Sequence, residues 1–433
     1  MFNRSAKSAI ALRVNERIFY GWVMLGVGGL GIFASGPGQS HLFSVFVTPM
    51  SEDLGLNRTS VSSAYAAATL VASFGLPYVG RLIDRHGVER VAPVVAGLLG
   101  LAACSFSGVS NLALLTLGFG ALRFLGQGSL MLSCNNLASQ WFARKRGFAL
   151  GLMALGFSVS MAAHPALAQY LIDTVGWREA WIWLGVITWA LLLPPFVFLL
   201  HGKPEALGLR PDGDASVDDN GARSSSDALA DVGLTLREAM RTAPFWIIAA
   251  GLACLSSLIT ALFFHQVSIF ETQGLNARAA ATMFAVSAAT MVVVMPLIGK
   301  MLDRFPANRM FACAVLSQSV SLLAMTFVDS LASAVAYAVV FGLNNAAIHT
   351  HYTFMWPRFF GRRHLGAIQG TAQTIGVMAA SLGPLPLGYY FDLTGSYTGI
   401  LVALAALPLI PAALSLTMSP PVATLAQAAA EST

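Results

Sequence analysis

The sequence predicts an all-α membrane protein with twelve transmembrane helices in two pseudo-symmetric six-helix bundles. Of its 433 residues, 56% are hydrophobic and only 10% are charged, whereas about 25% are charged in an average soluble domain. A soluble protein of this length could not cover so much apolar surface. Twelve apolar segments are long enough, at about 20 residues, to cross a hydrocarbon layer of about 30 Å, and half of the chain repeats the other half.

The predicted spans follow one another through short loops, with one longer hydrophilic stretch between the sixth and the seventh. That stretch is rich in Pro, Gly, Ser and Asp, which predicts a flexible linker, and its segment 234–241 predicts a short surface helix. The end of the chain after Pro421 is expected to be disordered. The spans are expected at 20–48, 60–82, 91–110, 112–138, 147–173, 179–201, 243–270, 279–301, 308–328, 331–356, 365–390 and 398–418.

The predicted organisation has five parts. They are a cytoplasmic N-terminal tail (1–17), an N-terminal bundle (18–201), a cytoplasmic linker (202–242), a C-terminal bundle (243–418) and a cytoplasmic C-terminal tail (419–433).

The two halves match at a fixed offset of 219 residues, most clearly where Leu54 to Arg90 aligns with Gln273 to Arg309. Duplication of this kind is typical of carriers that rock one half against the other around a site between them. The identical pairs are Gly55/Gly274, Leu56/Leu275, Asn57/Asn276, Pro77/Pro296, Gly80/Gly299, Asp84/Asp303, Arg85/Arg304, Arg90/Arg309, Gly147/Gly366, Gly151/Gly370 and Pro165/Pro384.

Basic residues predict the orientation of the spans. All Lys and Arg residues except Arg58, Arg123, Arg178 and Arg278 fall in the N-terminal tail or in the loops on the same side of the membrane as that tail. The positive-inside rule therefore places both termini in the cytoplasm. The first span carries no small-residue cleavage site, so we expect it to stay in a multi-pass protein of a bacterial inner membrane.

Arg123 is the only charged residue deep within a predicted span, because the acidic residues in the spans all lie near the ends. A charge in the membrane interior costs several kcal/mol unless it faces water or a partner, which makes Arg123 a candidate functional residue. Two interpretations are open. Arg123 either binds an anionic solute or ties its helix to neighbouring backbone carbonyls.

Histidines are the remaining groups in the spans that could exchange protons near neutral pH. Alternatively, a weakly acidic substrate carries the proton itself, and each histidine is a hydrogen-bonded packing residue. His41 with Gln39 and His265 with Gln266 occur on the first span of each half. The five histidines in the spans are His41, His164, His265, His349 and His351. The last two are not a predicted zinc site, since residues i and i+2 of a helix face apart.

The segment Gly80-Arg-Leu-Ile-Asp84-Arg85 after the second span, with its copy Gly299-Lys-Met-Leu-Asp303-Arg304 after the eighth, resembles the loop signature of the major facilitator superfamily. Arg123 with the following Gly-Gln-Gly, and the Gly/Pro-containing fifth and eleventh spans, are similar to further motifs of that family. The resemblance implies two six-helix bundles, a central cavity and alternating access. It also implies a gating role, rather than substrate contact, for Gly80, Asp84, Arg85, Gly299, Asp303 and Arg304.

Two further segments, Tyr20-Gly21-Trp22 and Lys203 to Gly213, resemble the monocarboxylate and oxalate/formate carriers of that superfamily. Those relatives place an arginine in the eighth span, and some place a lysine in the eleventh, to hold anionic substrates. Residues 279–299 and 365–390 here contain no basic side chain. A dianion such as oxalate is therefore not expected, because its charge would go uncompensated in a low-dielectric cavity.

We therefore expect a monomeric secondary carrier that moves a small monocarboxylate or aromatic acid with a proton. Arg123 would anchor the anion, and amide and imidazole side chains would supply hydrogen bonds at a low desolvation cost. Those pocket residues would be Gln39, His41, His265, Gln266, Asn344 and Asn345.

The rival interpretations are a proton-driven efflux pump for hydrophobic compounds, an uptake carrier for a neutral or vitamin-like solute that stacks on aromatic side chains, and a transporter-derived sensor. An enzyme is least expected, since no metal-ligand cluster, nucleophile elbow or phosphate loop is found. No cofactor is implied. The basic residues sit in short loops, so nothing indicates a nucleic-acid partner.

Overall fold

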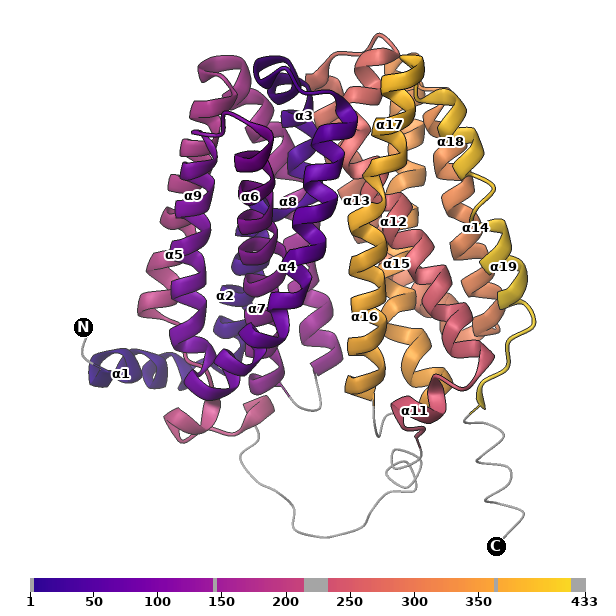
Figure 1. Ribbon diagram of the computed structural model, residues 1–433. Coiled ribbons are helices and arrows are strands. Elements are labelled where there is room, and N and C mark those ends of the chain that lie inside the picture. Colours follow the sequence, from indigo (N-terminus) through magenta and orange to yellow (C-terminus); the bar gives the residue numbers. More distant parts are fainter. Residues whose placement is uncertain (1–3, 143–145, 214–232, 362–364, 422–433) are drawn as a thin grey trace, which may run out of the picture. The chain divides into compact units, whose positions relative to one another are not determined.

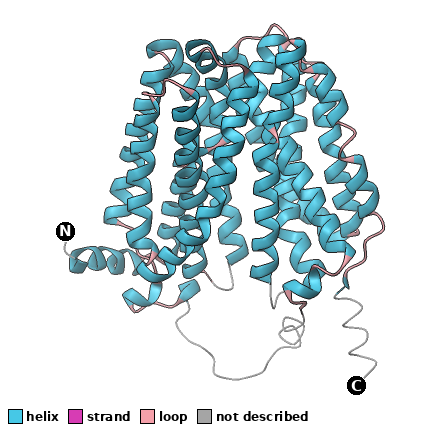
Figure 2. Ribbon diagram, viewed as in Figure 1, coloured by secondary structure: helices cyan, strands magenta, loops and turns pink. Residues whose placement is uncertain are grey.

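The computed structural model describes residues 4–142, 146–213, 233–361 and 365–421. These residues form helices joined by short loops (Figures 1 and 2), and the described part contains no strand beyond one isolated bridge between Gly233 and Gly361. The chain divides into two compact units, residues 1–218 and 219–433. The division falls within the segment expected to be a linker, of which residues 214–232 lie outside the described part.

Unit 1 contains the first six predicted spans. The fourth span is interrupted by a π-helical segment, η2, and the first by a short 3-10 segment, η1. The helices are α1 (Arg4–Asn15), α2 (Gly21–Ala34), η1 (Gly36–Gly38), α3 (Ser40–Leu54), α4 (Arg58–His86), α5 (Val88–Phe106), α6 (Leu112–Leu122), η2 (Arg123–Leu130), α7 (Met131–Trp141), α8 (Arg146–Val175), α9 (Trp177–Phe198), η3 (Pro204–Leu207) and η4 (Pro211–Gly213).

Unit 2 contains the other six spans, preceded by the predicted surface helix. Its eleventh span is divided at Gly383 and its twelfth between residues 404 and 409. The helices are α11 (Leu236–Ala239), α12 (Ala243–Thr272), α13 (Ala277–Arg304), α14 (Ala307–Met325), α15 (Leu331–Phe360), α16 (Leu365–Leu382), α17 (Pro384–Thr394), α18 (Thr398–Leu404) and α19 (Leu409–Ser415).

Every predicted span coincides with helix. By length and composition alone, eight helical segments of the described chain could cross a membrane. The spans outside that set are the first, fourth and eleventh, which are interrupted, and the ninth, α14.

The sequence repeat reappears as a repeat of local structure. Asn57 and Asn276 cap α4 and α13 by accepting a hydrogen bond from the backbone amide three residues on, at 2.8 and 2.7 Å. This is the favoured role of asparagine at a helix start. Two residues earlier in each copy, Gly55 and Gly274 adopt the left-handed φ values of 61° and 86°, which a residue with a β-carbon adopts at a cost.

The packing of helices repeats as well. In unit 1 the first span packs on the fifth (α2 on α8), the second on the fourth (α4 on α6) and the third on the sixth (α5 on α9). In unit 2 the corresponding pairs are α12 on α16, α13 on α15 and α14 on α19. Two halves that share capping residues and helix pairings are what duplication of one six-helix unit would produce.

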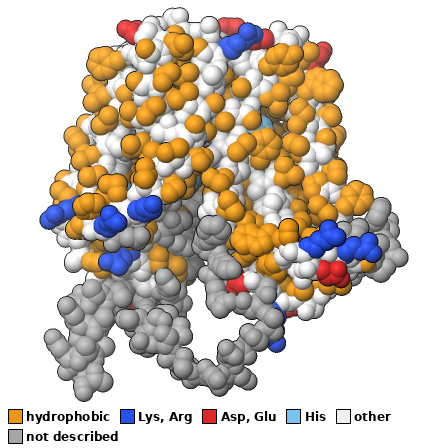
Figure 3. Space-filling view, turned by 180° about the vertical axis from the view of Figure 1, so that it is seen from behind, with side chains coloured by type: hydrophobic (Ala, Val, Ile, Leu, Met, Phe, Trp, Pro, Cys, Tyr) orange, Lys and Arg blue, Asp and Glu red, His pale blue; other side chains and the backbone are white. Residues whose placement is uncertain are grey.

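The outward-facing side chains suit a lipid environment. Figure 3 shows hydrophobic side chains over the middle of the molecule, with Lys, Arg, Asp and Glu toward its ends. Large apolar residues such as Phe74 and Phe327 are 70% and 73% exposed. Such exposure would be costly in water and is favourable in a hydrocarbon layer.

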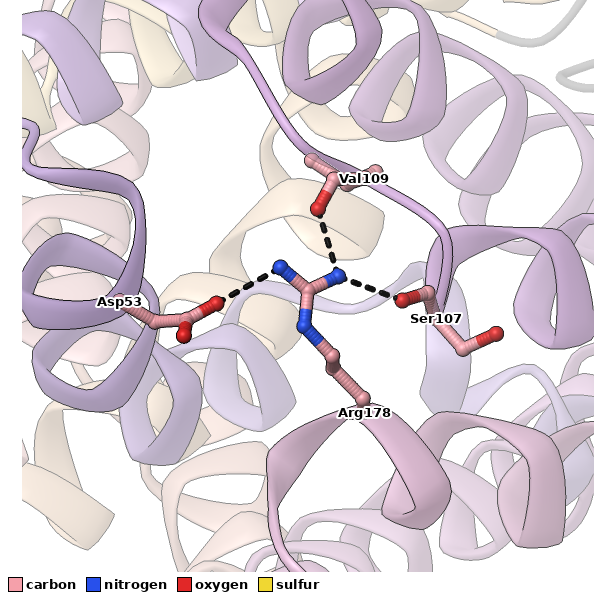
Figure 4. Close-up of polar contacts among 4 residues, drawn as sticks. All are labelled: Asp53, Ser107, Val109 and Arg178. Carbon is pink, nitrogen blue, oxygen red and sulfur yellow. Dashed lines mark hydrogen bonds and ion pairs between the residues drawn. The ribbon is translucent and has the colours of Figure 1, made fainter.

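Arg178 connects three parts of unit 1 by hydrogen bonds (Figure 4). Its Nη1 atom donates to the carbonyl oxygens of Ser107 and Val109, both at 2.7 Å, and Nη2 lies 2.6 Å from Asp53 Oδ2. The guanidinium also lies 4.3 Å from the centre of the Trp177 ring. Arg178 thus joins the end of α3, the loop after α5 and the start of α9.

The described flanking segments are short helices. Thr235 and Glu238 form a capping box at the start of α11, which matches the predicted surface helix. The segment after Pro421 lies outside the described residues.

Candidate functional site

The first span of unit 1 is interrupted at Gly36-Pro37-Gly38, and the interruption packs against η2. Proline lacks a backbone N–H, and glycine lacks the side chain that would block close approach. A β-carbon at Gly38 would overlap the Leu122 carbonyl oxygen, and one at Gly126 would lie 2.8 Å from the Gly38 α-carbon. Glycine is therefore required on both sides of this contact, which brings η1 within reach of Arg123.

Arg123 lies beside the interruption and is only 2% exposed. Its Nη1 atom donates to the Gly38 carbonyl oxygen at 3.0 Å and to Ser40 Oγ at 3.3 Å. The guanidinium carbon lies 5.1 Å from the centre of the Tyr65 ring, whose hydroxyl is 2.7 Å from Ser40 Oγ. In this conformation Arg123 therefore donates to a backbone carbonyl, as the second of the two interpretations above describes.

No ion pair of Arg123 with an acidic side chain occurs among the described residues, and its Nε atom has no hydrogen-bond partner there. Carbonyl and hydroxyl oxygens and an aromatic face offset part of the cost of burying this charge. They leave it without a full countercharge. The environment of Arg123 would therefore suit an added anion.

Gln39 and His41 directly follow the interruption in the chain. Gln39 Nε2 donates to Ser35 Oγ at 3.0 Å and approaches Met131 Sδ at 3.3 Å. His41 is 1% exposed, and its Nε2 atom lies 3.5 Å from Ser160 Oγ. The structure therefore brings Gln39, His41 and Arg123 together around one break in a helix.

His164 of α8 completes this group. Its Nδ1 atom lies 3.0 Å from Ser160 Oγ, so one serine hydroxyl lies between the two imidazoles. Its ring packs against Gly36, where a β-carbon would overlap it, and against Phe33 at 4.8 Å between ring centres. His164 is thus held against the interruption from the side of α8.

In unit 2, His265 and Gln266 of α12 bind neighbouring helices. His265 Nε2 lies 2.9 Å from the Pro384 carbonyl oxygen, and its Nδ1 lies 3.4 Å from the Tyr397 hydroxyl. Gln266 donates to the Ala280 carbonyl oxygen at 3.2 Å and accepts from the Tyr337 hydroxyl at 3.3 Å. Both side chains are fully buried, so in this conformation their hydrogen bonds join helices.

Asn344 and Asn345 face different surroundings although they are adjacent in α15. Asn345 Nδ2 donates to the Phe341 carbonyl oxygen of its own helix at 2.8 Å. Asn344 donates to Gln318 of α14 and accepts from Ser317 Oγ at 3.1 Å. Gln318 Nε2 is buried without a partner among the described residues. No described hydrogen bond joins this group to His265 and Gln266.

The arginine has no counterpart in unit 2. At the offset of the repeat its position is occupied by Gly342. A β-carbon there would overlap the Ser287 carbonyl oxygen and lie 2.7 Å from Thr290 Cβ. Likewise, His41 corresponds to Thr260 and His265 to Phe46. The two histidines therefore lie on corresponding spans but not at corresponding positions.

Residues 28–384 match the sequence profile of the Major Facilitator Superfamily. The chain belongs to the major facilitator superfamily. This membership, together with the all-helical structure, confirms the predicted fold class and identifies a multi-pass membrane transporter rather than an enzyme.

Individual proteins of the superfamily are similar over different shares of the chain. Human monocarboxylate transporter 2 is 24% identical over 407 residues, which cover 87% of this chain and 81% of that protein. The oxalate:formate antiporter of Oxalobacter formigenes is 24% identical over 39% of this chain and 40% of its own length. The predicted resemblance to the monocarboxylate and oxalate/formate branch is thereby confirmed.

A solved structure shares the fold. A bacterial homologue of the human lysosomal transporter Spinster, in an inward-facing and unoccupied conformation, superposes with a TM-score of 0.69. The superposition covers 92% of this chain and 96% of that protein at 15% sequence identity. At that identity the likeness concerns the fold.

The superfamily's loop motifs lie at the ends of α4 and α13. Asp84, Arg85 and Arg304 are exposed, and a β-carbon at Gly80 or Gly299 would meet nothing within 4 Å. These glycines are therefore not required by a close contact in this conformation. The side chain of Asp303 lies outside the described residues. The gating role of all six residues remains a prediction.

Three hydroxyl residues near the interruption were not among the predicted site residues. Ser40 and Tyr65 bind each other and Arg123, and Ser160 lies between His41 and His164. His164 had a visible signal, since it is an imidazole in an apolar span. The hydroxyl residues had none, because serine and tyrosine are common in spans and only the packing of helices selects these.

Proposed function

We propose that this protein is a monomeric secondary active transporter that moves a small monocarboxylate or aromatic acid, together with a proton, across a bacterial inner membrane. It would do so by alternating access, with both termini in the cytoplasm. Arg123 would hold the carboxylate. Gln39 and His41 would lie near it, and His265, Gln266, Asn344 and Asn345 would supply polar contacts from the second bundle.

The observation that carries this proposal is the burial of Arg123 without an acidic partner among the described residues. A buried cation of this kind is costly, and the cost falls when an anion binds beside it. A carboxylate is the organic group that a guanidinium binds best, through charge-assisted hydrogen bonds. The similarity to monocarboxylate transporter 2 supports the same substrate class.

A single buried cation favours a single negative charge. The buried polar side chains of unit 2 discussed above are amides and imidazoles, and the position equivalent to Arg123 is Gly342. A second carboxylate would have to be desolvated without a fixed countercharge, which is unfavourable in a low-dielectric site. Monoanions should therefore be preferred over oxalate.

The proposal can be tested with purified protein in proteoliposomes. A panel of radiolabelled monocarboxylates, aromatic acids, oxalate and neutral aromatic solutes is offered with and without an inward proton gradient, and protein-free liposomes measure passive entry. We expect accumulation of one or more monoanions, dependent on the gradient, and none of oxalate. Movement of neutral solutes or dyes alone would contradict the proposal.

Aromatic side chains of unit 2, on which a neutral or hydrophobic solute would stack, contact one another. Phe263 packs edge-on against Phe341 at 4.9 Å between ring centres, and Phe341 stacks on Tyr337 at 5.6 Å. These rings contribute to packing within unit 2, so they do not favour the efflux or vitamin-like alternatives. Deletion of the gene should accordingly impair growth on organic acids and leave tolerance of dyes unchanged.

A further inference from the structure

Two buried imidazoles in unit 1 share one hydroxyl group. Ser160 Oγ lies 3.5 Å from His41 Nε2 and 3.0 Å from His164 Nδ1, and all three residues are at most 4% exposed. His41 belongs to α3 and His164 to α8, so the link crosses between the first and fifth spans. It lies at the interruption, because His41 follows it in the chain and His164 packs on Gly36.

The surroundings of this cluster contain one fixed charge. Arg123 of η2 binds Ser40, the residue before His41. The other titratable groups facing it from the neighbouring helices are Tyr65 of α4 and Cys134 of α7, and α2 and η1 contain none.

Acidic groups of the two helices are distant. Glu52 and Asp53 of α3 stand about 17 and 18 Å along the helix from His41, and Asp173 of α8 stands about 14 Å from His164, at a rise of about 1.5 Å per residue. Arg178 and Glu179 lie at the start of α9, where Arg178 pairs with Asp53. The acidic side chains of α3 and α8 therefore lie too far along their helices to neutralise a proton on this cluster.

This arrangement can hold one added proton. A serine hydroxyl accepts one hydrogen bond and donates another at the same time. His164 Nδ1 also lies 3.2 Å from the Ser160 carbonyl oxygen, so a protonated His164 can donate to Ser160 while the Ser160 hydroxyl donates to the unprotonated Nε2 atom of His41. A second proton would place two like charges next to each other beside Arg123, which is unfavourable in a low-dielectric interior.

We propose that His41, Ser160 and His164 form the coupling-proton site of the carrier, and that it takes up one proton when a carboxylate binds at Arg123. The inference rests on the proposed function. While Arg123 is unneutralised, its positive charge opposes protonation of the imidazoles. A bound carboxylate removes that opposition, so substrate and proton each raise the affinity for the other by the same factor.

A coupling-proton site differs from a purely structural cluster in that its loss abolishes proton-driven accumulation but need not abolish substrate exchange. Two transport assays in proteoliposomes distinguish the two roles. Counterflow at equal pH on both sides requires substrate exchange and no net proton movement. Accumulation under an inward gradient of one pH unit requires coupling, and with one proton per monoanion it reaches about tenfold. The variants are His41→Gln, His164→Gln and Ser160→Ala. The control is His351→Gln, which removes a buried imidazole of α15 outside the cluster.

We expect His41→Gln and His164→Gln to lose the tenfold accumulation. Ser160→Ala should reduce the accumulation and retain counterflow. The control, His351→Gln, should retain both activities. A second measurement does not depend on turnover. In detergent, a pH-sensitive dye should record about one proton taken up per substrate bound by the wild type and by His351→Gln, and none by the two histidine variants.

The outcomes are distinct. Wild-type accumulation and proton uptake in all three cluster variants would overturn the proton site and leave the transport function intact. A wild-type protein that neither exchanges nor accumulates any acid would overturn the proposed function, and the proton site with it.

Discussion

Arg123 is the residue on which the proposed chemistry depends. Its charge is buried beside a carbonyl oxygen, a serine hydroxyl and a tyrosine ring. Each of these partners is neutral, so they reduce the cost of burial without removing the charge. The same guanidinium can therefore stabilise a break in the first span and offer a site for an anion.

Replacement of Arg123 by alanine should abolish the uptake of an anionic substrate. Removal of one partner of a buried charge pair costs about 2–5 kcal/mol, which corresponds to a loss of at least about 30-fold in affinity. Arg123→Lys keeps the charge but lacks the planar fork of donors, so it should retain part of the uptake. Thermal unfolding in detergent measures the structural contribution separately. Unchanged uptake by Arg123→Ala would remove this residue from the site.

At the scale of single residues, the sequence predicts a buried charge better than it predicts the residues that bind that charge. Arg123 was recognisable because it is the lone charge in the interior of a span. Its contacts with Gly38, Ser40 and Tyr65 were not, because they depend on which helices pack together. Asn345 and Gln266 are predicted pocket residues that in this conformation bond to backbone carbonyls, which any buried amide can do when a carbonyl is close.

At the scale of the elements, the interruption of the first span and the π-helical segment of the fourth form one contact. Gly38 and Gly126 meet there without side chains between them, and Arg123 reaches a carbonyl oxygen of the interruption. A regular helix would direct that oxygen into its own hydrogen-bond ladder. The break makes it available to the arginine.

Gly38→Ala should destabilise the protein, whereas Gly26→Ala should not. The new methyl group at Gly38 would overlap a backbone oxygen, and overpacking of this kind costs about 1–3 kcal/mol. The control at Gly26 lies on the same span with nothing within 4 Å of the added atom, and alanine favours a helix by about 1 kcal/mol over glycine. Melting temperatures in detergent should therefore fall for the first variant and hold or rise for the second. Equal values would contradict the close contact.

The elements themselves could largely be predicted from the sequence. The lengths of the apolar segments predicted all twelve spans. Thr235 and Glu238, which form the capping box of α11, lie within the predicted surface helix. The interruption at Gly36-Pro37-Gly38 was not predicted, although Gly-Pro-Gly within an apolar segment is a turn signal. The π-helical segment at 123–130 was not predicted either, because an altered hydrogen-bond register leaves no mark on hydropathy.

At the scale of the whole molecule, duplication explains the fold more fully than it explains the site. The two units share caps, left-handed glycines and three helix pairings. The charged and polar interior has diverged, with Arg123 in one unit and Gln318 bound to Asn344 in the other. Structural features have been kept in both copies, whereas the buried arginine occurs in one, with Gly342 at the equivalent position of the other.

Asp84→Asn should slow transport more than it weakens equilibrium binding of the substrate. The residue is exposed at the end of α4, far in sequence from Arg123, and the superfamily's motif assigns it a conformational role. We expect the maximal uptake rate to fall about tenfold or more, with substrate affinity in detergent within about threefold of the wild type, since an affinity change below about 0.6 kcal/mol indicates little direct contact. Glu52→Gln, another exposed acidic residue of unit 1, serves as the control. A loss confined to binding would contradict the gating role.

Gly342 has a consequence for the charge balance of the two halves. The Ser287 carbonyl oxygen and the Thr290 side chain fill the space that a longer residue would need at this position. An arginine there would require α13 and α15 to separate, so this single substitution cannot give the two halves equal charge. The electrostatic difference between the halves is thus maintained by van der Waals contact, and a change of specificity would have to arise around one cation rather than two.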